Sequence, residues 1–432
     1  MATTFPKYAI LSHTWGKAEA TFQDWQSLES AATKTGFAKI EGACRQAIRD
    51  GLGYVWADTN CIDKSSSSEL SEAINSIPLA SLQDPGSLTS PEQRRRLFQD
   101  SRWFERGWTL QELLAPGRCF FYGAAWNFLG TKDTLARFIC EATGIESKFI
   151  LGTAPIGSAS ISKRMSWVSK RRTTRAEDIA YCMLGIFNIN LPMLYGEGAR
   201  PFLRLQEELI RISADQTIFC WEWGRAVPAS WGSILAPSPA EFANCGGFLP
   251  KLSSFAGEIT PYALTNIGMT ITLPYLQTST RGICGILNVV HENSDLTRPT
   301  FLSFHRISDG DLLQRFHLPK TPFQMGDGMK LDVLPPKGFN IRARQSDGVS
   351  APIVVVPKTS PDSSHGFLLL SDTVTYTGHR YANAHIVDYA SKMPMLHFVP
   401  SPSQDFYAVM LHDFKDTSGQ PVVATIILAL RT

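Results

Sequence analysis

Residues 8–16, YAILSHTWG, join a continuous apolar run to a short polar segment, and residues 54–63, YVWADTNCID, repeat that pattern. Continuous apolar runs are typical of parallel strands that are buried on both faces. Between the two runs, residues 37–48 place Phe37, Ile40, Cys44 and Ile48 along one helical face. The sequence therefore predicts a β-α-β opening, with 8–11 and 54–57 as adjacent parallel strands.

The alternation of helices and strands continues to about residue 225. Capping boxes at Ser66–Glu69 and Thr174–Glu177 predict two helix starts. Apolar periodicity and turn residues predict further helices at 102–114, 135–142 and 202–212, and a strand at 119–122. The first half is therefore predicted to be an α/β parallel sheet with flanking helices.

After Trp223 the pattern changes to short strands separated by Gly, Pro, Asp and Ser turns. We expect an α/β domain at residues 1–145, a helical extension at 146–225 and a β-rich C-terminal domain at 226–432, with an antiparallel sandwich or barrel. The predicted strands lie at 269–273, 285–290, 352–356, 366–370, 406–410 and 422–430.

Composition excludes several classes of protein. Hydrophobic residues make up 44% of 432 residues, so a disordered chain is excluded. Lys and Arg total 41 against 39 Asp and Glu, which predicts no nucleic-acid partner. The eight cysteines include no C-x-x-C pair and the histidines match no zinc spacing, so we expect reduced thiols and no metal. With no signal peptide or membrane segment recognised, we expect a soluble cytoplasmic protein.

Three segments contain the candidate site residues. Residues 12–16 and 58–63 follow the two predicted strands, where ligands of parallel α/β sheets bind. In the third segment, 103–114, Trp108 and Glu112 lie four residues apart and share a helical face, which suits an aromatic ring and a developing positive charge.

Each of these residues also has a purely structural explanation. Trp108 could be core, with Glu112 paired to Arg106 or Arg102. Asp58 and Asp63 could cap turns, and His13 and Cys61 could simply pack near a strand end.

Five long motifs, in order, resemble the fungal heterokaryon-incompatibility (HET) domain and its usual downstream extension: YAILSHTWG, VWADTNCIDKSSSSELSEAINS, SRWFERGWTLQELLAP, RTTRAEDIAYCMLGIFNINLPMLYGEG and RLQEELIRISADQTIFCW. The resemblance implies a role in non-self recognition that leads to programmed cell death. PYALTNIGMTITLPYL is similar to the β-rich tail of members that lack a nucleotide-binding oligomerisation module, and the chain has no Walker-type motif.

The HET domain in turn resembles the Toll/interleukin-1 receptor (TIR) domain, some members of which hydrolyse NAD with a helix glutamate. GWTLQELL is similar to the corresponding motif, with Trp108 and Glu112 in its tryptophan and glutamate positions. The resemblance implies that Glu112 is catalytic in a possible NAD(P) glycohydrolase, with NAD or NADP as substrate and no cofactor. The substrate-binding residues would be Ser12, His13, Trp15, Gly16, Asp58, Cys61, Asp63, Arg106, Trp108 and Gln111.

One strand of the family pattern is missing. After Ile77 the chain continues as a connector rich in Pro, Ser and Arg, and we expect residues 78–96 to be mobile and to add no central strand. Either the sheet closes around the gap, or the chain is a gene-model or splicing variant with a compromised site.

The basic run at 163–175 has two interpretations. It could bind nucleotide phosphates or an acidic partner, or it could be a solvated connector before the helix expected near Thr174. Its members are Lys163, Arg164, Lys170, Arg171, Arg172 and Arg175.

Two functions are compatible with these features. One is a NAD(P)-consuming death effector, and the other is a non-catalytic HET module that acts by self-association or by recruiting other incompatibility proteins.

Overall fold

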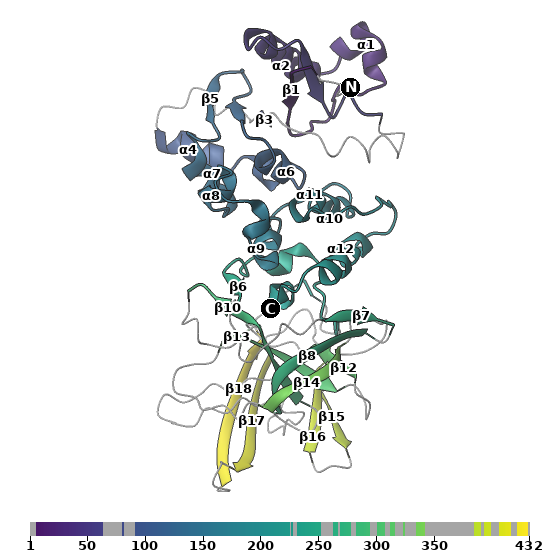
Figure 1. The fold of residues 1–432 in the computed structure, drawn as a ribbon, viewed down its shortest axis with the longest axis vertical. Helices are drawn as coiled ribbons and strands as arrows, with labels where there is room; N and C mark the ends of the chain where they lie inside the picture. The colour runs from purple at the N-terminus through teal and green to yellow at the C-terminus, as the bar shows by residue number, and fades with distance from the viewer. Residues whose placement is uncertain are drawn as a thin grey trace. The chain divides into compact units, whose positions relative to one another are not determined.

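The computed structural model has a mixed α/β fold that divides into two compact units (Figure 1). The first unit comprises Met1–Ala159 and Arg164–Leu205, and the second comprises Ser160–Lys163 and Gln206–Thr432. The structure describes residues 6–63, 80–81, 91–224, 226–227, 231–251, 262–266, 268–277, 282–293, 300–306, 312–315, 323–324, 334–341, 384–389, 393–398, 406–415 and 421–430.

The predicted β-α-β opening is confirmed. Strands β1 (Tyr8–Leu11) and β2 (Tyr54–Ala57) pair in parallel, and helix α2 (Phe37–Arg49) contacts both. Leu11 of β1 and Ile40 of α2 belong to one buried cluster, so burial of an apolar helix face against the strands holds this part together. Both strands end at the same edge, which brings the segments after them close to each other.

A second sheet contains β3 (Ala80–Ser81), β4 (Phe120–Tyr122) and β5 (Phe128–Thr131), in that order. β4 confirms the strand predicted at 119–122. The connector was expected to contribute no central strand; its two strand residues pair in parallel with β4, at the sheet edge among the described residues. It also forms helix α4 (Pro91–Gln99), which the sequence analysis missed.

The predicted single helix at 102–114 was wrong, because it is broken into α5 (Arg102–Glu105) and α6 (Thr109–Leu114). Arg172 makes the backbone contacts at the break: its N–H donates to the carbonyl of Glu105 (2.6 Å), and its carbonyl accepts from the N–H of Gly107 (2.9 Å). A Cβ on Gly107 would lie 2.5 Å from Cγ2 of Thr173, so only glycine allows this close crossing.

The helix predicted to start near Thr174 begins later, at α10 (Asp178–Tyr181), and continues as the separate helix α11 (Leu184–Phe187). The carboxylate of Glu177 accepts hydrogen bonds from the backbone of Gly196 and Gly198, at 2.8 and 3.0 Å. The expected capping box therefore does not form, because the Glu177 carboxylate binds backbone N–H groups of the loop at 196–198.

Two other predicted helices are confirmed. α7 (Ala136–Thr143) ends at Gly144, whose φ of 71° is left-handed, and α12 (Arg200–Ile212) carries the expected amphipathic pattern. The helix expected from Ser66 lies outside the described residues. The remaining helical elements are η1 (Asp24–Gln26), α1 (Leu28–Ala32), α8 (Ser147–Ile150), η2 (Ile156–Ser158), α9 (Ile161–Ser166), η3 (Gln216–Phe219) and η4 (Pro239–Phe242).

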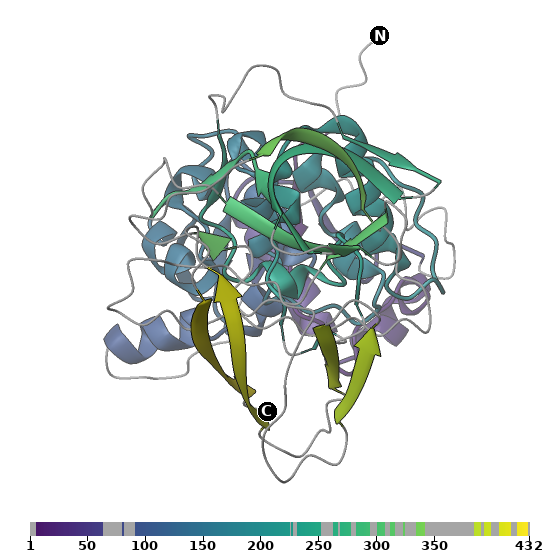
Figure 2. The ribbon, with the colours of Figure 1, turned by 90° about the horizontal axis from the view of Figure 1, so that it is seen from below.

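In the second unit, the described elements from residue 248 onward are strands. The pairings β12–β14–β8–β9–β11–β12 close into a ring, and Figure 2 shows the curvature of these strands. β6 pairs with β10, and β15–β16 and β17–β18 form antiparallel pairs. The strands are β6 (Phe248–Pro250), β7 (Ala263–Thr265), β8 (Gly268–Gln277), β9 (Gly282–Leu287), β10 (Val289–His291), β11 (Thr300–Arg306), β12 (Leu312–Arg315), β13 (Phe323–Gln324), β14 (Leu334–Ile341), β15 (Ala384–Tyr389), β16 (Met393–Phe398), β17 (Phe406–Lys415) and β18 (Pro421–Leu430).

The strands predicted at 269–273, 406–410 and 422–430 are confirmed within β8, β17 and β18. The strand predicted at 285–290 was wrong in its continuity, because Asn288 separates β9 from β10. The N–H of Asn288 donates to Gln216 at 2.7 Å instead of joining a ladder. The strands expected at 352–356 and 366–370 lie outside the described residues.

Candidate functional site

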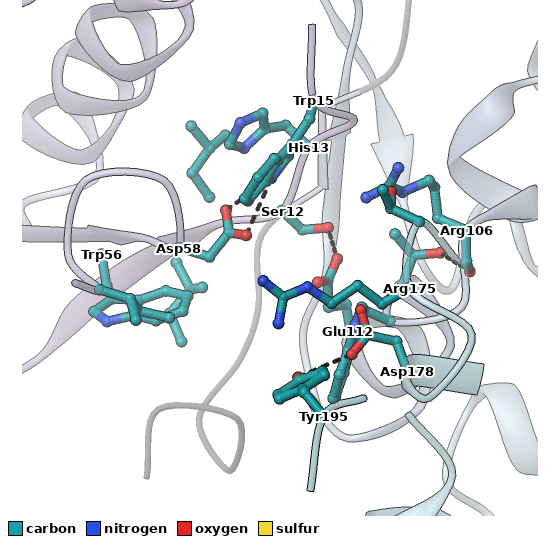
Figure 3. Close-up of a pocket in the computed structure, with 16 residues that line it drawn as sticks. Ser12, His13, Trp15, Trp56, Asp58, Arg106, Glu112, Arg175, Asp178 and Tyr195 are labelled. Carbon is teal, nitrogen blue, oxygen red and sulfur yellow. Dashed lines mark hydrogen bonds between the residues drawn. The ribbon is translucent and has the colours of Figure 1, made fainter. Parts of the chain in front are cut away.

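A cavity of ≈ 250 Å³ opens at the carboxyl ends of β1 and β2, in the first unit (Figure 3). Its size is close to the lower end for small-molecule pockets, roughly 300–1,000 Å³. It is lined by Ile10, Leu11, Ser12, His13, Trp15, Trp56, Asp58, Ile62, Arg106, Trp108, Thr109, Glu112, Thr174, Arg175, Asp178 and Tyr195.

Glu112 is held at this cavity by a chain of hydrogen bonds. The hydroxyl of Ser12 donates to its carboxylate, and the indole N–H of Trp103 donates to the hydroxyl of Ser12 at 2.8 Å. Trp103 is fully buried and packs edge-on against Phe104 and Phe121. An aromatic core thus positions the serine, and the serine orients the carboxylate.

Burial raises the pKa of Glu112 to about 7. The hydrogen bond from Ser12 acts in the opposite direction, nearby Asp58 raises the pKa further, and the positive charges of Arg106 and Arg171 lower it. Glu112 can therefore exchange a proton near neutral pH, which an ordinary exposed glutamate cannot do efficiently.

Arg171 braces the helix that carries Glu112. Its Nη1 donates to the carbonyl of Arg106 (2.7 Å) and to the hydroxyl of Thr109 (2.9 Å), and its Nε donates to the carbonyl of Trp167 (3.2 Å). Burial lowers the pKa of this guanidinium to about 10. These bonds connect the start of α6 to residues 167–171, so the cavity depends on both segments.

Aromatic rings form much of one side of the cavity. Trp15 is 38% exposed, and its indole N–H donates to both carboxylate oxygens of Asp58, at 3.1 and 3.3 Å. Trp56 and Trp108 also line the cavity. Flat apolar surfaces beside a carboxylate can hold an aromatic ring that carries positive charge.

The loop after β1 is held by the buried carboxylate of Glu19. His13 Nε2 lies 3.6 Å from it, Lys39 Nζ lies 2.6 Å from it, and the N–H of Gly16 donates to it. Burial would raise the pKa of Glu19, but these contacts outweigh burial and lower the pKa to about 2. Lys39 also donates to the carbonyl of Thr14 at 3.0 Å, which holds the loop in place.

Another part of the cavity wall comes from the segment after Thr173. The hydroxyl of Tyr195 donates to Asp178 at 3.0 Å, and the guanidinium carbon of Arg175 lies 4.5 Å from the centroid of the Tyr195 ring. Burial raises the pKa of both Asp178 and Tyr195.

The cavity brings together seven of the residues that the sequence analysis selected: Ser12, His13, Trp15, Asp58, Arg106, Trp108 and Glu112. Four others do not line it. The N–H of Gly16 binds Glu19, the Cys61 thiol accepts from Ala57 N–H (3.5 Å), Asp63 accepts from Gln23 (2.8 Å), and the Gln111 amide donates to the carbonyl of Cys182 (2.7 Å).

Thr174, Asp178 and Tyr195 were missed, because they lie far along the chain from the predicted strand ends. The capping-box motif at 174–177 predicted only a helix start, and Arg175 was selected only as a member of the basic run. The predicted pairing of Glu112 with Arg106 or Arg102 is not observed among the described residues, where its hydrogen-bond partner is Ser12.

The basic run serves several purposes. Lys163 pairs with Glu292 at 3.1 Å, Arg164 lies over the Phe187 ring at 4.5 Å, Arg171 is buried, and Arg175 lines the cavity. The run is therefore mixed: Lys170, Arg172 and Arg175 are exposed, whereas Lys163 and Arg171 are buried.

No group of His, Cys, Asp or Glu residues within the described parts of the chain is arranged to hold a metal ion. Within the same parts, no helix is both long and apolar enough to cross a membrane. None of the eight cysteines forms a disulfide.

The first unit is thus an α/β domain with a polar, aromatic-lined cavity at the ends of parallel strands. Residues 8–80 match the family described as Heterokaryon incompatibility protein (HET). Over 221 residues the chain is 41% identical to "Vegetative incompatibility protein HET-E-1" of Podospora anserina. This match covers 47% of this chain and 16% of that protein. No solved structure matches the chain.

Residues 8–80 therefore resemble a HET domain, and the chain spans about 16% of the length of the curated relative that it matches. The matched family segment includes both cavity-lining loops that follow β1 and β2, whereas Glu112 and the wall formed by residues 174–195 lie beyond it.

Proposed function

We propose that this chain is an effector of fungal non-self recognition that triggers cell death by hydrolysing the nicotinamide–ribose bond of NAD or NADP. The observation that carries the proposal is the placement of Glu112 in a cavity with tryptophan walls at the ends of β1 and β2. The similarity to a protein named for vegetative incompatibility supports the biological role.

In the proposed reaction the C–N bond between ribose and nicotinamide breaks. The bonding electrons leave with nicotinamide, which becomes neutral, and the ribose carbon acquires oxocarbenium character before water adds to it and releases a proton. The ionised Glu112 stabilises that charge, and the Ser12 hydroxyl orients the carboxylate. Trp15 and Trp108 hold the ring, and the backbone after Ser12 approaches a phosphate.

We further propose that residues 1–145 are a TIR-like HET domain, 146–225 its helical extension and 226–432 a β-rich C-terminal domain. The parallel pairs β1–β2 and β3–β4 support the TIR-like assignment. Residues 174–195 complete the cavity wall, which supports joint action of the domain and its extension. We place this activity in the cytoplasm.

The second candidate function is a non-catalytic module that acts by self-association or by recruiting other incompatibility proteins. One observation favours it. With a pKa of about 7, a fraction of Glu112 is neutral at physiological pH and supplies no counter-charge.

The experiment compares the full chain with its Glu112→Gln variant. The control is Glu29→Gln, which replaces an exposed carboxylate on α1. NAD and NADP loss by purified protein and viability of expressing cells are followed at matched soluble levels. We expect Glu112→Gln to lose about two to three powers of ten in rate, because the amide supplies no charge. Killing without NAD loss supports the non-catalytic module, and full NAD loss by a folded Glu112→Gln variant refutes the catalytic role.

A further inference from the structure

Two arginine side chains line the cavity without a salt bridge to a carboxylate of the described residues. Among the described residues, neither Arg106 nor Arg175 forms an ion pair. Arginines elsewhere in the first unit do, such as Arg95 with Glu141 (2.6 Å) and Arg204 with Glu197 (2.9 Å). A guanidinium group that lines a cavity and is not held in a salt bridge keeps N–H groups that can bind an anionic ligand.

Arg175 is the better placed of the two. Its guanidinium projects into the middle of the cavity, beside Glu112 (Figure 3). The face of the Tyr195 ring holds it at 4.5 Å, and the hydroxyl of that ring is tied to Asp178. Because Tyr195 is itself anchored, the arginine is pre-oriented and loses less conformational freedom when it binds an anion.

The acidic residues of the same cavity already have partners. Asp58 accepts from Trp15, Glu112 accepts from Ser12, and Asp178 accepts from Tyr195. The cavity therefore contains carboxylates suited to a cationic ring and, at Arg175, a guanidinium suited to an anion. The planar guanidinium fork matches phosphate geometry. A cavity of ≈ 250 Å³ accommodates a small ligand better than an extended protein surface.

We propose that Arg175, assisted by Arg106, is the phosphate-binding subsite of this cavity, so that the ligand is a nucleotide and not a nucleoside. This inference deepens the proposed function and rests on it for the identity of the ring. It assigns substrate selection to a residue of the segment after Arg171, outside the residues that match the HET family model. Nicotinamide mononucleotide would bind, and nicotinamide riboside, which has the same ring and ribose without the phosphate, would bind poorly.

The test is a binding experiment that needs no turnover. Titration of the full chain with nicotinamide mononucleotide and with nicotinamide riboside is followed by the fluorescence of the tryptophans at the cavity. The variants are Arg175→Gln, Arg175→Lys and the control Lys170→Gln, which removes one exposed positive charge from the same basic run. Circular dichroism and thermal unfolding verify that each variant folds like the parent.

We expect the parent and Lys170→Gln to prefer the mononucleotide by at least tenfold, and Arg175→Gln to lose that preference. Arg175→Lys should fall between them, because lysine retains the charge but not the planar fork. Added salt should weaken mononucleotide binding to the parent more than binding to Arg175→Gln.

Equal affinity of the parent for both ligands, no binding of either one, or an undiminished preference in Arg175→Gln would overturn the subsite. Failure of the proposed function is a separate result: binding that depends on Arg175 with no NAD or NADP loss would retain the subsite and remove the hydrolysis.

Discussion

Replacing Glu112 by glutamine should change how the stability of the protein depends on pH. The pKa of Glu112 is about 7 in the folded state, against a usual value of 4.5, chiefly because of burial. Between these two values the folded state binds more protons than the unfolded state, so the free energy of unfolding of the parent falls as pH rises from 4.5 to 7. Above pH 7 the free energy of unfolding has fallen by the full amount that this titration can cause.

The size of the effect follows from the same two values. At about 1.36 kcal/mol per pH unit, the parent loses at most about 3 kcal/mol across this window. Glutamine stays neutral and avoids that loss, but it gives up the charge-assisted bond from Ser12, worth roughly 1 kcal/mol. We therefore expect Glu112→Gln to be about equal to the parent or slightly less stable at pH 4.5, and about 2 kcal/mol more stable at pH 8.

The assay is urea unfolding of the full chain, followed by tryptophan fluorescence, at intervals from pH 4.5 to 8.5. The transition to compare is the one that includes Trp15, Trp56 and Trp108, since a chain with two compact units need not unfold in a single transition. Glu29→Gln, which replaces an exposed carboxylate on α1, serves as the control. A constant difference between Glu112→Gln and the parent, or one that moves in favour of the parent as pH rises, would refute the reasoning.

Two further changes test the supports of the cavity. Gly107→Ala should destabilise the first unit by about 1–3 kcal/mol, because the new Cβ would lie 2.5 Å from Cγ2 of Thr173. Thr173→Ser in the same chain removes that methyl group and should restore part of the lost stability. Thermal unfolding of the single and double variants measures this, and losses that simply add in the double variant would contradict it. Glu19→Gln should lower the free energy of unfolding by about 2 kcal/mol at pH 7, and by progressively less as pH falls below 4.5 towards 2, because His13, Lys39 and Gly16 lower the pKa of Glu19 to about 2. Urea unfolding midpoints from pH 7 to 3 measure this difference. A loss of stability that does not depend on pH would exclude the ionic explanation.

Local patterns determined much of the first unit. The apolar runs at 8–11 and 54–57 became parallel strands in register, and the amphipathic segments became α2, α7 and α12, since each must bury one face whatever its surroundings. The polar segments after these strands therefore had to meet at one edge, which made Ser12 and Asp58 predictable.

Long-range backbone contacts decided the rest of the cavity. Between residues 102 and 114 Gly107 is the one residue that signals a helix break, and the cause of the break is the crossing of Arg172 some 65 residues later. The same crossing brings the segment with Arg175 to the cavity that contains Glu112. Helical periodicity and capping boxes describe only neighbours along the chain, and hydrogen bonds across such distances outweigh them by pairing backbone groups that would otherwise be buried unpaired. The sequence alone thus determined the two strands and the carboxylate, and only the tertiary structure decided which charges face that carboxylate.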